Sequence, residues 1–436
     1  MNSRNNTSSQ IKKRLFTLFI SLFAITLIGC QSVEVKDEPL QQTASPYKSP
    51  YRPIETLETG SILHVPTGTL LSESELYSFI ASSNIIYVGE SHKSVNHHKV
   101  QLNIIKALDR EFPEGLSVGM EMFKTSSQDE INQWLNDELS DKEFYKLWMK
   151  NWGVDFEYYR LILEYIKKNN IPLIALNAPP EAVKALAHET MRTTESTEEE
   201  DEFLSDLPTI DTTDPYHRAM TKAVFTDPNH ANSNFDSFYN IQLLWEETMA
   251  ETIAEYLISN AGFDQRMIVL AGGGHINYGF GIPKRLFRRL SEPYTTIMPV
   301  STDILNDDEK AAEAIEKGAQ FLEVDMPSVP LYIADFVWAT EFKTITTKAP
   351  RLGVYLVENG EQVAITIVSD STPAKEYGLL EGDVIIKLDD TPIRDILDIK
   401  YFLKDKEYGD RIVVTVKRSE TTLDIKMMLK PMMKKK

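Results

Sequence analysis

Six short apolar runs recur through residues 60–342, each rich in β-branched side chains and separated from the next by a longer amphipathic stretch. Strands and helices that alternate in this way form a parallel sheet with helices packed against its faces. We therefore predict an α/β domain with a mainly parallel sheet. Its predicted strands are residues 84–89, 116–122, 171–176, 267–271, 295–300 and 332–338.

Length, charge and cysteine content narrow the classes of protein to consider. A chain of 436 residues is long for one compact domain, which predicts at least two. The formal net charge is −19, and Lys and Arg cluster only at the two termini, so nucleic acid is excluded as a partner. Cys30 is the only cysteine, so the chain has no intrachain disulfide.

Two Ser-x-x-Glu segments mark expected helix starts. Ser72 precedes Glu75 and Ser127 precedes Glu130 at the spacing of a capping box, in which both side chains bind free backbone N–H groups. An apolar stripe within residues 158–166, followed by Lys167 and Lys168, predicts another helix.

Polar side chains follow the predicted strands, whose carboxyl ends meet at one edge of the sheet. Glu90 and His92 follow the first strand, Glu121 lies near the end of the second, Asn177 follows the third, and His275 follows three glycines after the fourth. His92, His275 and Glu121 suit a divalent metal such as Zn or Mn, with Glu90 or Glu121 as a general base on metal-bound water. Purely structural roles for the same residues stay open. The glycine run lacks G-x-G-x-x-G, which disfavours a dinucleotide site.

Two further segments leave alternatives open. His97 and His98 either lie at the start of the next helix or reach the same edge of the sheet. Residues 191–238 interrupt the alternation with an acidic run, Glu198 to Glu202, and form either a solvated surface insertion or a lid over a site.

The amino terminus has the pattern of a secretory signal. Basic residues up to Arg14 precede an apolar stretch at 15–28, which is short for a transmembrane helix. The stretch ends in Leu27-Ile28-Gly29-Cys30, which resembles a bacterial lipoprotein signal: residues 1–29 are removed and Cys30 is lipidated. A plain signal anchor is the alternative. Residues 30–59 read as a polar tether. No Asp follows Cys30, and by resemblance to sorting signals this favours an outer-membrane lipoprotein facing the periplasm or the cell surface.

A Lys/Thr-rich linker at 343–350 leads to a second, smaller β-rich domain at 351–432, with predicted strands at 353–357, 364–369, 383–388 and 411–417 and a helix at 397–402. The segments Arg351-Leu352-Gly353-Val354, Ser371-Thr372-Pro373-Ala374 and Glu381-Gly382-Asp383-Val384-Ile385 resemble a bacterial PDZ domain of the protease-associated kind. The resemblance implies that Leu352, Gly353 and Val354 bind the terminal carboxylate of a polypeptide, which adds a strand to the sheet. A degenerate module that only packs on its neighbour is the alternative.

The first domain also resembles a known family, over roughly residues 60–342. The resemblance rests on Val88-Gly89-Glu90-Ser91-His92, Gly119-Met120-Glu121-Met122-Phe123, Ile174-Ala175-Leu176-Asn177-Ala178-Pro179, Trp245-Glu246-Glu247-Thr248-Met249-Ala250, and Ala271-Gly272-Gly273-Gly274-His275 with Gly281-Ile282-Pro283. These motifs are similar to those of ChaN-like haem-binding lipoproteins of the Tiki/TraB/erythromycin-esterase superfamily.

The resemblance to ChaN-like proteins implies that the chain binds haem or an iron complex and takes part in iron uptake. Haem is therefore the first choice of cofactor. His92, His275 and Tyr278 are the candidate haem contacts, with Tyr158 as a further candidate ligand. Tiki-type relatives imply instead a metal-dependent hydrolase or peptidase that uses the paired G-x-x-H motifs. A homodimer stays open as the assembly.

Overall fold

The computed structural model describes residues 57–153, 156–190, 207–225, 234–260, 265–305, 332–345 and 349–431. The expected signal, Cys30, nearly all of the tether, and residues 191–206 and 226–233 of the acidic insertion lie outside the described residues. Within the described part, no helix is both long enough and apolar enough to cross a bilayer.

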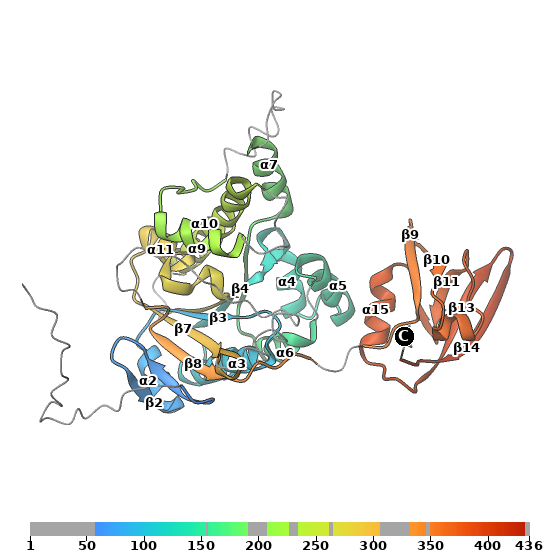
Figure 1. Cartoon of the computed structure of the whole chain (residues 1–436), viewed down its shortest axis with the longest axis horizontal. Helices are drawn as coiled ribbons and strands as arrows, with labels where there is room; N and C mark the ends of the chain where they lie inside the picture. The colour runs from blue at the N-terminus through green and yellow to red at the C-terminus, as the bar shows by residue number, and fades with distance from the viewer. Residues whose placement is uncertain are drawn as a thin grey trace, which may run out of the picture. The chain divides into compact units, whose positions relative to one another are not determined.

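The first domain is built on an eight-stranded sheet with the order β2-β1-β8-β7-β3-β6-β4-β5 (Figure 1). The six strands from β8 to β5 in this order are parallel, and β1 pairs antiparallel with β8 and β2. Each predicted strand overlaps one of the six parallel strands, which confirms the α/β prediction, whereas the short strands β1 and β2 were not predicted. The bounds are β1 Ile62–His64, β2 Thr69–Leu71, β3 Ile85–Glu90, β4 Leu116–Lys124, β5 Leu173–Asn177, β6 Arg266–Gly272, β7 Tyr294–Ser301 and β8 Phe336–Thr340.

Strand β6 lies between β3 and β4, and this order brings distant parts of the sequence together. Glu90 of β3 lies opposite Gly272 of β6, and Met120 of β4 lies opposite Leu270 of β6. The carboxyl ends of these three strands are therefore neighbours at one edge of the sheet.

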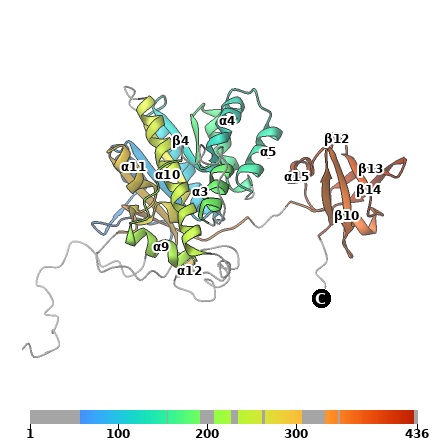
Figure 2. The same cartoon turned by 90° about the horizontal axis from the view of Figure 1, so that it is seen from above.

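Helices cover both faces of the sheet, with α10 and α11 above it and α3 and α6 below it in Figure 1. On β3, Ile86 and Val88 pack in the core beside α3 and α6, while Ile85 and Tyr87 pack beside α10 and α11. Alternate strand residues point to opposite faces, so the central strands are buried on both sides. Figure 2 shows the long helix α10 in yellow-green. The bounds are α2 Glu73–Ile80, α3 Val95–Glu111, α4 Gln128–Leu135, α5 Asp141–Asn151, α6 Arg160–Lys168, α7 Pro180–Thr190, α9 Pro215–Phe225, α10 Phe235–Ser259, α11 Ile282–Arg289 and α12 Thr302–Leu305.

The helix starts agree only in part with the capping pattern. Ser72 and Glu75 form the predicted capping box of α2. Ser127 directly precedes α4 but makes no cap hydrogen bond, because its hydroxyl donates to Asn151 Oδ1 instead (3.2 Å). Ser140, which was not predicted, forms a capping box at the start of α5.

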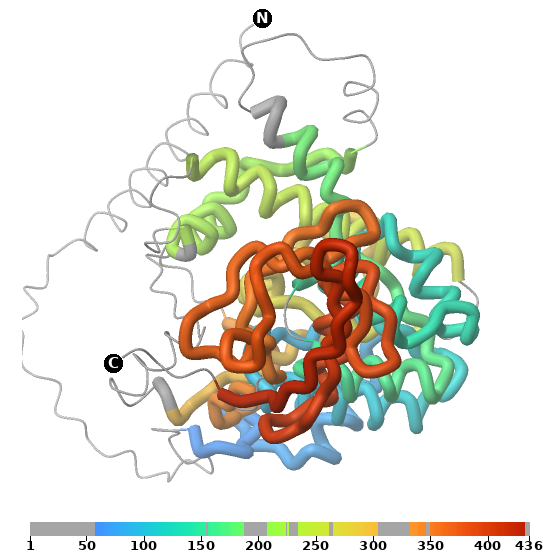
Figure 3. The backbone as a smooth tube through the Cα atoms, turned by 90° about the vertical axis from the view of Figure 1, so that its right-hand side faces the viewer, coloured from blue at the N-terminus to red at the C-terminus, as the bar shows by residue number. Residues whose placement is uncertain are grey.

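The second domain is an antiparallel sheet in the order β14-β13-β11-β10-β9, with β12 paired to β11. Its strands are drawn in orange to red in Figure 3. The domain has an apolar core of its own, which includes Leu352, Ile385 and Ile399. The predicted strands and helix are present, whereas β12 and β14 were missed. The bounds are β9 Val354–Asn359, β10 Gln362–Val368, β11 Val384–Leu388, β12 Thr391–Pro392, β13 Arg411–Arg418, β14 Thr421–Met428, α14 Pro373–Glu376 and α15 Ile396–Lys404.

Candidate functional site

The carboxyl ends of β3, β6 and β4 form a rim, by which we mean residues 90–92, 121–124 and 272–275. His92 and Glu121 converge over Gly272 at this rim. A Cβ atom placed on Gly272 would lie 3.1 Å from His92 Nε2 and 3.5 Å from Glu121 Oε2. Glycine at this position therefore leaves room for the His92 ring beside the Glu121 carboxylate.

Glu90 is buried and fixes the orientation of His92. Its Oε1 lies 2.7 Å from His92 Nδ1 and also accepts a hydrogen bond from the Tyr159 hydroxyl. Its Oε2 accepts a hydrogen bond from Gln101 Nε2 (2.7 Å) and lies 3.3 Å from His98 Nδ1. Burial alone would raise the pKa of Glu90, but the His98 charge and the hydrogen bonds from His92 and His98 hold it well below its usual range. Glu90 is therefore an ionised carboxylate that leaves His92 Nε2 free to face the rim.

His275 lies between two carboxylates. Its Nε2 is 3.4 Å from Glu121 Oε1, and its Nδ1 is 3.1 Å from Glu246 Oε1. Glu121 in turn accepts a hydrogen bond from the Gly272 backbone N–H (2.6 Å). Burial lowers the pKa of His275, but Glu121 and Glu246 outweigh it and raise this pKa to about 10. Both ring nitrogens of His275 are therefore engaged, Nε2 by Glu121 and Nδ1 by Glu246 and Gln242 (3.0 Å).

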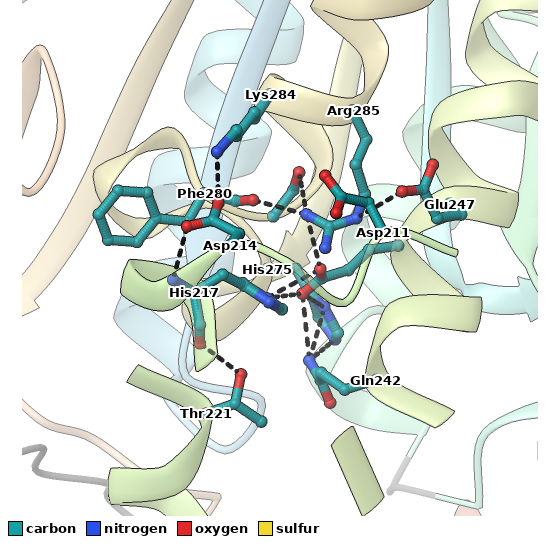
Figure 4. A network of polar contacts seen from close by, with 12 residues as sticks. Asp211, Asp214, His217, Thr221, Gln242, Glu247, His275, Phe280, Lys284 and Arg285 are labelled. Atoms are coloured by element: carbon teal, nitrogen blue, oxygen red, sulfur yellow. Dashed lines mark hydrogen bonds and ion pairs between the residues drawn. The ribbon is translucent and has the colours of Figure 1, made fainter. Parts of the chain in front are cut away.

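Glu246 of α10 is the centre of a second buried network. Figure 4 shows His217, His275 and Arg285 pointing toward one another, and the distances place Glu246 between them. Its Oε2 lies 2.9 Å from His217 Nε2 and 3.2 Å from Arg285 Nη1. His217 comes from α9, so the described part of the acidic insertion contributes a fully buried residue and is more than solvated surface.

Lys124 and Trp152 complete the described edge of the rim. The Lys124 ammonium lies 6.0 Å from the centre of the Trp152 ring, and the same indole meets the His92 ring edge-on at 4.9 Å. Neither residue was predicted, because no sequence pattern marks a lysine or a tryptophan as part of this edge.

The two tyrosine candidates differ in their surroundings. Tyr278 has φ +58°, a left-handed conformation that is strained for a bulky residue, and its ring stacks on Phe280 at 5.6 Å. Backbone strain of this kind clusters at binding and active sites, which keeps Tyr278 a candidate contact. The Tyr158 hydroxyl instead accepts a hydrogen bond from the Ile345 backbone N–H (3.2 Å).

The structure thus brings Glu90, His92, Glu121 and His275 together at one edge, as the strand order requires. Lying at one edge does not by itself make these four residues a metal centre, however. Among the described residues, no group of three or more His, Cys, Asp or Glu side chains is arranged to hold a metal ion. The prediction of a Zn or Mn site at His92, His275 and Glu121 therefore gains no support.

The loop before β9 carries the residues predicted to bind peptide. Leu352 is buried in the core of the second domain, and Gly353 has φ +88°. A Cβ on Gly353 would lie 2.4 Å from Thr372 Cβ, so only glycine fits this turn. Val354 begins β9, the edge strand to which a bound polypeptide would add.

The position of His275 predicts how stability depends on pH. Its folded pKa of about 10 lies above the ordinary value of 6.5, so its contribution is complete below pH 6.5 and is lost as the pH rises toward 10. We expect the free energy of unfolding of the first domain to fall between pH 7 and 10, by up to roughly 1.4 kcal/mol per pH unit from this group. The His275→Gln variant should lack that part of the slope. Urea unfolding followed by tryptophan fluorescence measures it, because all five tryptophans lie between residues 134 and 338. Equal slopes for the two proteins would contradict this pKa.

Comparisons with known proteins identify both domains. Residues 76–286 match the family of haem-binding uptake proteins of the Tiki superfamily, ChaN, and residues 350–429 match the PDZ domain family. The chain joins a ChaN-type domain to a PDZ domain. Both resemblances inferred from the sequence motifs are thereby confirmed.

Individual relatives of the ChaN-type and PDZ domains are distant. "Protein RETICULATA-RELATED 5, chloroplastic" of Arabidopsis thaliana is 22% identical over 297 residues, which cover 64% of this chain and 37% of the plant protein. The structure of cofacial haem binding to ChaN of Campylobacter jejuni is 14% identical and covers 64% of this chain and 95% of that chain, with a TM-score of 0.46. The HtrA3 PDZ domain bound to a phage-derived ligand is 15% identical and covers 18% of this chain and 83% of that one, with a TM-score of 0.17. This chain thus matches little more than a third of its plant relative.

Proposed function

We propose that the ChaN-type domain binds haem at the rim, with His92 as the axial ligand of the iron. The observation that carries this proposal is the state of the two rim imidazoles. The His92 side chain is 36% exposed and its Nε2 has no hydrogen-bond partner among the described residues, whereas the His275 side chain is 9% exposed and both of its nitrogens face carboxylates. A histidine ligand that hydrogen-bonds a carboxylate through its other nitrogen has a fixed orientation and a more basic ligating atom.

The rim offers the groups that haem requires. Haem needs an axial ligand, aromatic or apolar surface and cations for its propionates. His92 supplies the ligand, Trp152 supplies aromatic surface at 4.9 Å from it, and Lys124 supplies a cation on the same indole. Tyr278, whose backbone is strained, is the second candidate contact. Bound haem would supply an iron centre, and the side chains of the chain would hold and orient it.

Haem binding also gives a role to the other parts of the chain. Lipidation at Cys30 would tether the protein to a membrane, in our proposal the outer membrane, facing the periplasm or the cell surface. The Leu352-Gly353-Val354 loop would capture the carboxyl terminus of a polypeptide and bring it to the membrane-bound chain. We infer a part in the uptake of haem or iron, in which the polypeptide partner delivers or receives the cargo.

A haemin titration tests the proposal. The purified chain, mixed with increasing haemin, is expected to give a Soret band shifted from that of free haemin and to saturate near one haem per chain. A protein that leaves the haemin spectrum unchanged would contradict the proposal. Saturation near half a haem per chain would point to one haem shared between two copies.

One observation favours hydrolysis as a second candidate function. The Glu90–His92 pair has the arrangement of a general base, with Nδ1 held by the carboxylate and Nε2 free toward the rim. In that case the chain would hydrolyse a peptide or ester substrate without haem, and His92→Ala would abolish the activity while the haemin spectrum stayed that of the free ligand.

A further inference from the structure

Lys124, the last residue of β4, is a half-buried cation without a carboxylate partner among the described residues. Its backbone N–H donates to Asn151 Oδ1 (2.8 Å), which fixes the chain where the strand ends. Its ammonium lies over the Trp152 ring at 6.0 Å. Because burying a charge without a partner is costly, this position calls for an explanation other than stability.

The carboxylates of the rim are already engaged elsewhere. Glu90 is held by His92, His98, Gln101 and Tyr159. Glu121 accepts the Gly272 N–H and faces the protonated His275. Burial lowers the pKa of Lys124, and the charge of Glu121 offsets this only in part. Lys124 therefore feels the charge of Glu121 but forms no ion pair with a carboxylate of the described rim.

Trp152 links this cation to the proposed ligand of the iron. The indole contacts the His92 ring at 4.9 Å and lies under the Lys124 ammonium. Because the His92 ring and the Lys124 ammonium contact the same indole, Lys124 lies within the span of a porphyrin held at His92.

We propose that Lys124 is an anion subsite of the rim that pairs with a carboxylate of the bound ligand. For haem, that carboxylate is a propionate. The inference rests on the proposed haem site for its location, but the subsite itself requires only a ligand that carries a carboxylate.

The experiment compares porphyrins with and without free carboxylates. Haemin and haemin dimethyl ester are titrated against the full chain, the Lys124→Met variant and the Lys106→Met variant. Lys106 is the matched control, since its ammonium also lies over an aromatic ring, that of Tyr165 (5.4 Å). Lys106 lies on α3, three turns from the start of that helix and outside the rim. The same titrations are repeated with iron-free protoporphyrin IX and its dimethyl ester, read by quenching of tryptophan fluorescence.

We expect Lys124→Met to weaken haemin binding roughly tenfold and to leave binding of the ester unchanged, because only the charged ligand loses a partner. Lys106→Met should change neither. An equal loss for haemin and its ester, or no loss for either, overturns the subsite.

The iron-free porphyrin separates this inference from the haem proposal. If protoporphyrin IX binds in a Lys124-dependent way while haemin shows no ligated Soret band, axial ligation fails and the subsite stands. If no porphyrin binds, both are overturned.

Discussion

Replacing Glu246 with alanine is expected to lower the free energy of unfolding of the ChaN-type domain by about 3–5 kcal/mol. Glu246 is fully buried, and burial alone would raise its pKa. The charge and hydrogen bond of His217, with contributions from His275 and Arg285, hold that pKa well below the usual range. Its removal would leave the buried Arg285 and His275 with less opposing charge, and an uncompensated buried charge costs far more than a lost surface contact.

A surface glutamate on the same helix is the control. Glu255 is exposed on α10, and Glu255→Ala should change the free energy of unfolding by no more than about 0.5 kcal/mol. Urea unfolding monitored by tryptophan fluorescence compares the two variants in the same domain. If Glu246→Ala is as stable as Glu255→Ala, the network in Figure 4 does not hold the domain together.

The rim could be predicted from the sequence because strand ends are local features. Glu90, His92, Glu121 and His275 each follow an apolar run, and parallel strands place their carboxyl ends at one edge. The order of the strands, which sets β6 between β3 and β4, is a property of the whole fold and no single run encodes it.

The partners of these residues could not be predicted, because they come from other elements. Glu246 was visible within a motif, but its contact with His275 depends on how α10 packs against β6. His217 lies in the acidic insertion without any partner spacing, and His98 could equally have been a helix-start residue. In the structure His98 is buried and its Nδ1 lies 3.3 Å from Glu90 Oε2, so His98 is a partner of that carboxylate.

His275 was predicted as a haem contact and a metal ligand from its place after a strand, but the second carboxylate beside it, Glu246, was not predicted. The predicted set joined His92, His275 and Glu121, whereas the structure places a carboxylate at each ring nitrogen of His275, and Glu121 and Glu246 outweigh the effect of burial and raise its pKa to about 10. Burial lowers the pKa of His92 too, and Glu90 and Glu121 outweigh it and raise this pKa, but among the described residues only Nδ1 of His92 is paired with a carboxylate. Only the geometry distinguishes the two pairs.

Replacing His92 with alanine is expected to weaken haem binding by about 100-fold or more. Loss of a partner behind a ligating histidine typically costs 10- to 100-fold, so loss of the ligand itself should reach the upper end of that range or exceed it. Folding should be affected little, because the His92 side chain is 36% exposed, against 0% for Glu90 and 9% for His275. The alanine also opens space beside Gly272 that a free imidazole can enter.

The most direct test is therefore a haemin titration of three proteins: the unchanged chain, His92→Ala, and His64→Ala, whose histidine lies on β1 and hydrogen-bonds Thr67 (2.8 Å). We expect a shifted Soret band for the unchanged chain and for His64→Ala, no such band for His92→Ala at the same concentrations, and its return when imidazole is added to His92→Ala. A His92→Ala variant that takes up haem with the affinity and spectrum of the unchanged chain would contradict it.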